Sequence, residues 1–208
     1  MIAYKFLADG RVGPFSGVHW PAKGEWLSAS GGRPCEGRIH ACRPQDLIDW
    51  MDSELWRVEL DGDVAVDCGK LVADRGRLVE RVEIWDAELM ARFAEACALR
   101  ARDAALTVLA PGSEASGALA ACGDAGSLAE ACAQLQGLGA REERATGYAG
   151  DAARHVLGAR AQPATAPTHA AVNGFIAAHA AAFAQDDVGA VAGERAWQTD
   201  WLTRALAP

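Results

Sequence analysis

The sequence lacks the features that define several common classes of protein. Its 208 residues contain no uncharged apolar run near the ~20 residues that cross a bilayer, and segment 1–10 lacks the apolar core of a secretory signal. The formal net charge is −8 and no basic block is present, which argues against general nucleic-acid binding. We therefore expect a cytoplasmic protein that binds neither membrane nor nucleic acid.

The familiar catalytic motifs are also missing. The phosphate-binding pattern GxxxxGK[ST] and the zinc pattern HExxH do not occur, and no Glu-x-x-His pair stands in the second half of the chain. Gly137 and Gly139 lack the third glycine of a dinucleotide fingerprint, and Ser16 stands one place late for a GxSxG nucleophile elbow. No particular cofactor is favoured by these patterns.

Alanine divides the chain into two parts. Residues 87–208 contain 39 alanines, whereas residues 1–86 contain 7. Apolar residues make up 50% of the chain and charged residues 23%, which is typical of a folded protein. We predict an α+β fold: a β-rich module over 1–86, with an antiparallel sheet and one short helix, and an alanine-rich helical bundle over 87–208 that packs against the sheet.

The clearest predicted strand is 55–60, where Trp56, Val58 and Leu60 alternate with charged residues and share one face. Closely spaced strands with short turns indicate antiparallel pairing. Further strands are expected in the first part at 2–7, 64–68, 70–73 and 78–85, with a turn at Arg75-Gly76 and a short helix at 44–52.

The second part is expected to be helical. On the segment 168–184 the larger side chains recur at helical spacing and predict one buried stripe: Val172, Phe175, Ile176, His179 and Phe183. The predicted helices are 87–105, 114–121, 128–135, 141–158, 168–184 and 188–206.

The densest group of reactive residues is the segment 35–42. If residues 39–42 are extended, His40 and Cys42 project to one face, where they could form a nucleophile–base pair or bind a metal ion. Cys35 could return across the glycine-rich loop as a third ligand of a zinc site, with His19 or Cys68 as a fourth. In the alternative interpretation, Cys42 packs inward and His40 hydrogen-bonds the loop. The six cysteines are otherwise expected to be free, mostly buried thiols.

Other polar residues offer further candidates. His179 is interpreted as a core histidine, or as an acid–base group in a pocket between sheet and bundle. His155 and His169 are expected at the surface. Four acidic residues surround the predicted short helix and form either a solvated face or a docking patch for a basic partner: Asp46, Asp49, Asp52 and Glu54.

Two segments carry a resemblance to known proteins. The residues Gly37–Leu47, with Trp50 and the strand 54–62, resemble a module of uncharacterised bacterial proteins in which a glycine turn ending in His-Ala-Cys precedes a short helix and an L-W-x-V-E-L-x-G strand. The alanine-rich part, ending in residues 194–202, is similar to helical proteins assigned as immunity proteins of bacterial toxin systems. The resemblance implies a bacterial cytosolic protein that binds another protein.

Two functions are therefore expected from the sequence. The first is a non-catalytic, immunity-like protein-binding protein, for which the helices could also supply a homodimer interface. The alternative is an enzyme of small-molecule metabolism that uses His40 and Cys42, or His179, at the junction of sheet and bundle.

Overall fold

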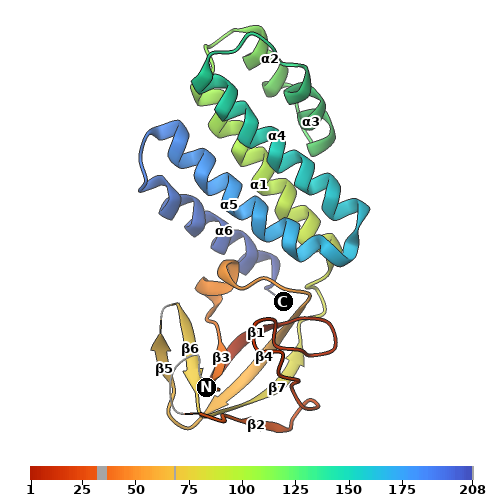
Figure 1. The fold of residues 1–208 in the computed structure, drawn as a ribbon, viewed down its shortest axis with the longest axis vertical. Coiled ribbons are helices and arrows are strands. Elements are labelled where there is room, and N and C mark those ends of the chain that lie inside the picture. The colour runs from red at the N-terminus through yellow and green to blue at the C-terminus, as the bar shows by residue number, and fades with distance from the viewer. Residues whose placement is uncertain (32–36, 68, 208) are drawn as a thin grey trace. The chain divides into compact units, whose positions relative to one another are not determined.

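The computed structural model describes residues 1–31, 37–67 and 69–207, which belong to two compact units (Figure 1). One unit contains Met1–Asp86 with Leu202–Pro208, and the other contains Ala87–Trp201. Antiparallel strands precede a helical region, so the predicted α+β class is confirmed. No helix in the described part of the chain combines the length and the apolar character needed to cross a bilayer.

The described residues of the first unit form two antiparallel sheets. In the larger sheet the strand order is β1 (Ile2–Leu7), β4 (Glu54–Asp61), β7 (Arg75–Arg81), β2 (Trp26–Ser28). In the smaller sheet the order is β3 (Ile39–Ala41), β6 (Lys70–Ala73), β5 (Ala65–Asp67). The expected short helix is a 3-10 helix, η1 (Pro44–Asp49), with Pro44 in its first turn.

The alternation expected in β4 is confirmed. Trp56, Val58 and Leu60 are buried, whereas Arg57 is exposed and Glu59 half-buried. Alternating burial of this kind is what a strand with one covered face produces. Some of the buried residues of this unit, from both sheets and including Trp20, form an apolar cluster: Ala3, Leu7, Trp20, Ile39, Ala41, Trp56, Val58, Leu60, Leu71, Ala73 and Leu78.

The prediction of a turn at Arg75-Gly76 is wrong, because both residues belong to strand β7. A Cβ on Gly76 would lie 2.9 Å from Ile39 Cγ2 and 3.3 Å from an atom of the Trp20 ring. Gly76 therefore allows close packing against the neighbouring side chains and does not form a turn. The strand also ends at Arg81, earlier than the sequence predicted.

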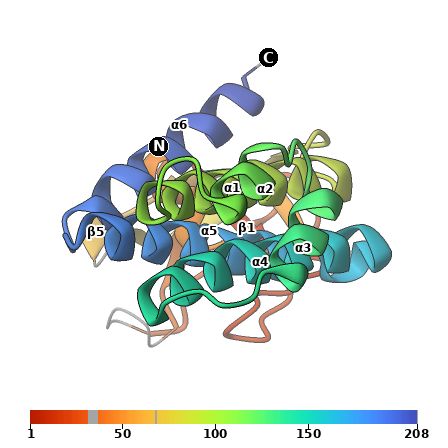
Figure 2. The same ribbon diagram turned by 90° about the horizontal axis from the view of Figure 1, so that it is seen from above.

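The second unit is a bundle in which α1 contacts both α4 and α5, and these two contact each other. Figure 2 shows α1 lying over α4 and α5. Along α1 the buried residues include Leu89, Phe93 and Cys97, which recur every four residues. The helical elements are α1 (Ala87–Val108), α2 (Glu114–Ala120), α3 (Ala125–Gln134), α4 (Ala140–Ala161), η2 (Pro163–Thr165), α5 (Ala166–Gln185) and α6 (Ala190–Ala205).

The prediction that the stripe of larger side chains forms the buried face of α5 is wrong. Phe175 is 59% exposed and His179 is exposed; their rings stack 6.3 Å apart. The buried face carries mainly small residues instead: Ala166, Pro167, Ala170, Asn173, Gly174, Ala177, Ala178 and Ala180. Small side chains let helix backbones approach closely, so packing selects the alanine face over the larger apolar one.

Buried polar side chains tie the bundle helices together. Asn173 is fully buried on α5 and donates from Nδ2 to the carbonyl oxygens of Ala94 (3.0 Å) and Ala152 (3.1 Å), on α1 and α4. On α6, Glu194 is buried and pairs with Arg100 of α1 at 2.6 Å. These contacts fix the relative register of the helices within this unit.

Candidate functional site

The candidate site lies where β1 meets the end of β3. Tyr4 and Cys42 exchange two backbone hydrogen bonds, with N···O distances of 2.9 and 2.7 Å. His40 pairs with Val72 across the smaller sheet, and Ala41 pairs with Leu71, the residue after Lys70. Long-range strand pairing therefore brings residues 4–6, 40–42 and 70 to one place.

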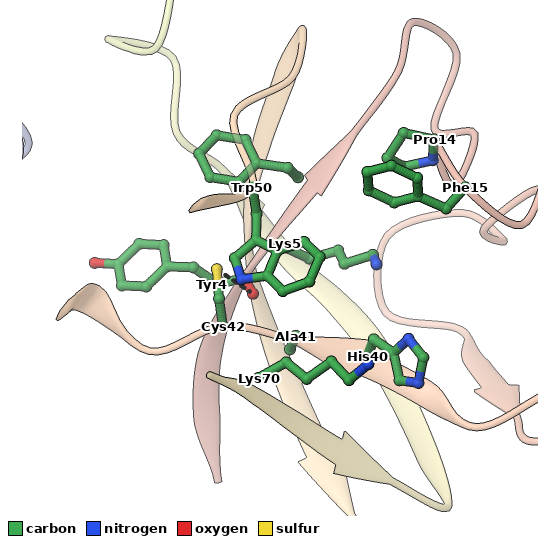
Figure 3. A pocket seen from close by; sticks show the side chains of 10 residues that line it. Tyr4, Lys5, Pro14, Phe15, His40, Ala41, Cys42, Trp50 and Lys70 are labelled. Atoms are coloured by element: carbon green, nitrogen blue, oxygen red, sulfur yellow. Dashed lines mark hydrogen bonds between the residues drawn. The ribbon is translucent and has the colours of Figure 1, made fainter. Parts of the chain in front are cut away.

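These residues line a small pocket with a volume of about 50 Å³, which we name the Lys5 pocket (Figure 3). Its aromatic and apolar side includes Phe15 and Trp50, whose rings meet edge to face at 6.2 Å. Phe15 is 86% exposed, so it stands at the rim and leaves its ring face accessible. The full lining is Tyr4, Lys5, Phe6, Pro14, Phe15, His40, Ala41, Cys42, Trp50 and Lys70.

The amine of Lys5 is the most unusual group in this pocket. Burial lowers the pKa of Lys5 to about 8, and the neighbouring Cys42 offsets part of that effect. Within residues 1–31, 37–67 and 69–207, the ammonium group has no hydrogen-bond or ion-pair partner, and it lies 5.9 Å from the centre of the Trp20 ring. The group remains mostly protonated at pH 7, so the pocket contains a poorly solvated positive charge.

A second ammonium group and an imidazole lie close to Lys5. Figure 3 shows the ends of Lys5 and Lys70 on the same side of the pocket as the His40 ring. Lys70 also pairs with Asp67 at 3.9 Å. Burial, followed by the charges of Lys70 and Lys5, lowers the pKa of His40, so this imidazole is neutral at pH 7.

Cys42 lines the same pocket but is buried as a thiol. Its Sγ donates to the Tyr4 carbonyl oxygen at 3.5 Å. Burial raises the pKa of Cys42 to about 12, although the charge of Lys5 partly opposes this shift. Because the thiolate is the nucleophilic form, the arrangement gives little reactivity to Cys42 at neutral pH.

Of the metal site expected at Cys35, His40 and Cys42, the structure describes only His40 and Cys42. Cys35 and the suggested fourth ligand Cys68 lie outside the described residues. Among the residues that are described, no group of three His, Cys, Asp or Glu side chains is placed to hold a metal ion. The described thiols are free, with Cys42, Cys97 and Cys122 buried and Cys132 half-buried.

The acidic residues around η1 do not form one solvated face. Asp46 is buried and accepts two hydrogen bonds from Arg43, at 2.6 and 3.1 Å. Glu54 is buried as well; its carboxylate accepts from the backbone N–H of Gly10 (3.1 Å) and from Trp56 Nε1 (2.8 Å). Two of the four carboxylates therefore hold the local structure together.

Two histidines expected to be separate surface groups lie together in the second unit. His155 of α4 and His169 of α5 approach to 2.8 Å between their Nδ1 atoms. Burial, followed by the charge of His169, lowers the pKa of His155. The pair stands 14 residues apart in the sequence, so no spacing within a single helix could have indicated it.

Comparison with known proteins adds no family to this description. No family model, curated protein or solved structure significantly matches the chain. The candidate site therefore depends on its own geometry. One sequence signal could have drawn attention to it: the chain has only three lysines, and two of them, Lys5 and Lys70, line this pocket.

Proposed function

We propose that the first unit is a binding module that receives an anionic group, carried on a planar apolar ligand, in the Lys5 pocket. The observation that carries this proposal is the ammonium group of Lys5, which lines the pocket and has no ion-pair partner among the described residues. An unpaired and poorly solvated cation is unfavourable in the free protein. An anion in the pocket would supply the missing counter-charge.

The size and the rim of the pocket favour a ligand with two parts, an anionic end group and a planar apolar group. A volume of about 50 Å³ accommodates an end group such as a carboxylate, but not a whole metabolite. The exposed ring of Phe15 and the ring of Trp50 offer apolar surface beside it. The anionic end would therefore approach Lys5 and Lys70, while the planar part rests on the aromatic rim.

Binding is better supported than thiol catalysis. Cys42 stays protonated at neutral pH, so the nucleophile–base pair considered for His40 and Cys42 would begin from its unreactive form. A neutral His40 can donate or accept a hydrogen bond to a bound ligand without adding charge. The bacterial, cytoplasmic, immunity-like function expected from the resemblance stays a prediction, and so does its protein partner.

Benzoate is the probe that tests this proposal, because it combines a carboxylate with one aromatic ring. We expect isothermal titration calorimetry at pH 7 to show benzoate binding more tightly than acetate, which lacks the ring, and than benzamide, which lacks the charge. Lys5→Met should weaken benzoate binding by at least about tenfold, because a charge-assisted hydrogen bond is lost.

Lys23→Met is the matched control, since Lys23 is the remaining lysine of the chain and is exposed. Its benzoate affinity should equal that of the wild type. Equal binding of benzoate and benzamide, or undiminished binding by Lys5→Met, would contradict the proposal.

A further inference from the structure

The contact between His155 and His169 places two metal-ligating atoms side by side in the second unit, away from the Lys5 pocket. Their Nδ1 atoms are 2.8 Å apart, and their ring centres are 5.1 Å apart with an interplanar angle of 58°. Both side chains are half-buried, so their edges remain reachable from solvent. The two residues come from α4 and α5, which pack against each other.

The backbone around this pair is shaped to receive the His169 ring. A Cβ on Gly158 would lie 2.7 Å from His169 Cε1 and 2.8 Å from its Nε2, which is closer than such atoms approach. Glycine at this position of α4 therefore makes room for the imidazole. Glycine is less favourable than alanine in a helix interior, but here its lack of a side chain leaves the space that the His169 ring occupies.

We propose that the Nδ1 atoms of His155 and His169 together bind a divalent first-row transition metal ion. The hydrogen bond between two neutral imidazoles uses one proton on one Nδ1. For an ion to bind both Nδ1 atoms, that ring would change to its other neutral tautomer, with the proton on Nε2, so that both Nδ1 lone pairs are donated to the metal. Metal–nitrogen bonds near ~2.0–2.1 Å would then meet close to a right angle, given the present Nδ1 separation.

A right angle between two imidazole ligands suits the tetragonal geometry of Cu²⁺ and the octahedral geometry of Ni²⁺. Water would fill the remaining positions, because the described residues provide no third His, Cys, Asp or Glu in reach of the pair. Asp151, one turn before His155, already pairs with Arg154. The bound ion would join α4 to α5 and remain exchangeable with solvent.

Thermal unfolding of the untagged full chain with and without NiCl₂ at pH 7.5 tests the site. We expect Ni²⁺ to raise the melting temperature of the wild type by a few degrees, because a ligand that binds only the folded state stabilises it. EDTA should reverse the rise. His155→Ala and His169→Ala should each abolish it, whereas His179→Ala, which removes an exposed histidine of α5, should keep it.

A second measurement keeps the proposal testable if a variant unfolds. The electron paramagnetic resonance spectrum of the Cu²⁺-loaded wild type should show hyperfine coupling from two imidazole nitrogens. Absence of any Ni²⁺ effect on the wild type, an unchanged effect in His155→Ala, or a Cu²⁺ spectrum without nitrogen coupling would overturn the proposal.

Discussion

We expect the Lys5→Met variant to be more stable than the wild type at pH 7, by about 1–3 kcal/mol in the free energy of unfolding. Burial lowers the pKa of Lys5 from 10.5 in the unfolded chain to about 8, so folding disfavours the charged amine. Methionine has a similar length and carries no charge that needs solvation. Urea unfolding followed by circular dichroism measures the difference.

The pH dependence of this difference identifies its cause. The pKa of Lys5 is lower in the folded than in the unfolded chain, so the charged amine destabilises the wild type fully below pH 8. This destabilisation disappears as the pH rises from 8 to 10.5, because the folded protein then contains the neutral amine. The difference in the free energy of unfolding between Lys5→Met and the wild type should therefore decrease from pH 8 to pH 10.5. Lys23→Met, which removes an exposed lysine, should show neither the stabilisation nor the pH dependence. A Lys5→Met variant less stable than the wild type at pH 7 would contradict the account.

A stabilising substitution that abolishes binding would mark Lys5 as a functional residue. Residues held at a cost to stability are found chiefly where a site needs them. The apolar alternative would fit β1, since its neighbours Ala3, Phe6 and Leu7 are all buried. We interpret the presence of a lysine here as a requirement of the ligand.

The largest destabilisation is expected from Asn173→Asp. Asn173 is fully buried, and its amide nitrogen donates to the carbonyl oxygens of Ala94 and Ala152, while its Oδ1 has no hydrogen-bond partner among the residues that the structure describes. A carboxylate of the same shape would direct a negative charge at two acceptors. We expect a loss of about 3–5 kcal/mol in the free energy of unfolding at pH 7, measured by urea unfolding.

The introduced carboxyl group should also show a characteristic pH dependence. Its pKa in the folded state would be raised above that of the unfolded chain, so the loss relative to the wild type should shrink as the pH falls toward 4. Asn173→Leu, which buries no charge, should lose less. Gln136→Glu makes the same chemical change at an exposed position and should alter stability by under about 0.5 kcal/mol. An Asn173→Asp variant as stable as the wild type would mean that this amide does not join the helices.

The strands show where a sequence pattern is sufficient and where it is not. The alternation around Trp56, Val58 and Leu60 predicted β4, because one covered face imposes a period of two. Gly76 was predicted in a turn because glycine usually marks one. Its real neighbours, Ile39 and Trp20, come from distant parts of the chain, and no local pattern indicates so close an approach.

The helices show a different limit. Their approximate positions follow from the alanine-rich composition and from the glycine and proline residues between them. Which face of α5 is buried could not be predicted in this way. Its larger apolar side chains indicated one face, but close packing against α1 and α4 buries the face with the small residues. The consequence for function is direct: His179 is an exposed residue beside Phe175 and not a core histidine.

Only some residues of the candidate site could be identified from the sequence. His40 and Cys42 stood out through their chemistry, and both line the Lys5 pocket. Lys5 did not stand out, because its importance depends on the pairing of Tyr4 with Cys42 and on the burial that this pairing brings. Long-range pairing of this kind cannot be read from the spacing of residues within one element.

The most direct test of the proposed function is an NMR titration of the Lys5 amine in the full chain, with and without saturating benzoate. We predict a pKa of about 8 in the free protein and a higher pKa in the presence of benzoate, because a bound carboxylate favours the charged amine. Benzoate binding should correspondingly weaken as the pH rises above 8. A Lys5 pKa that benzoate leaves unchanged, or a value near 10.5 in the free protein, would contradict the account.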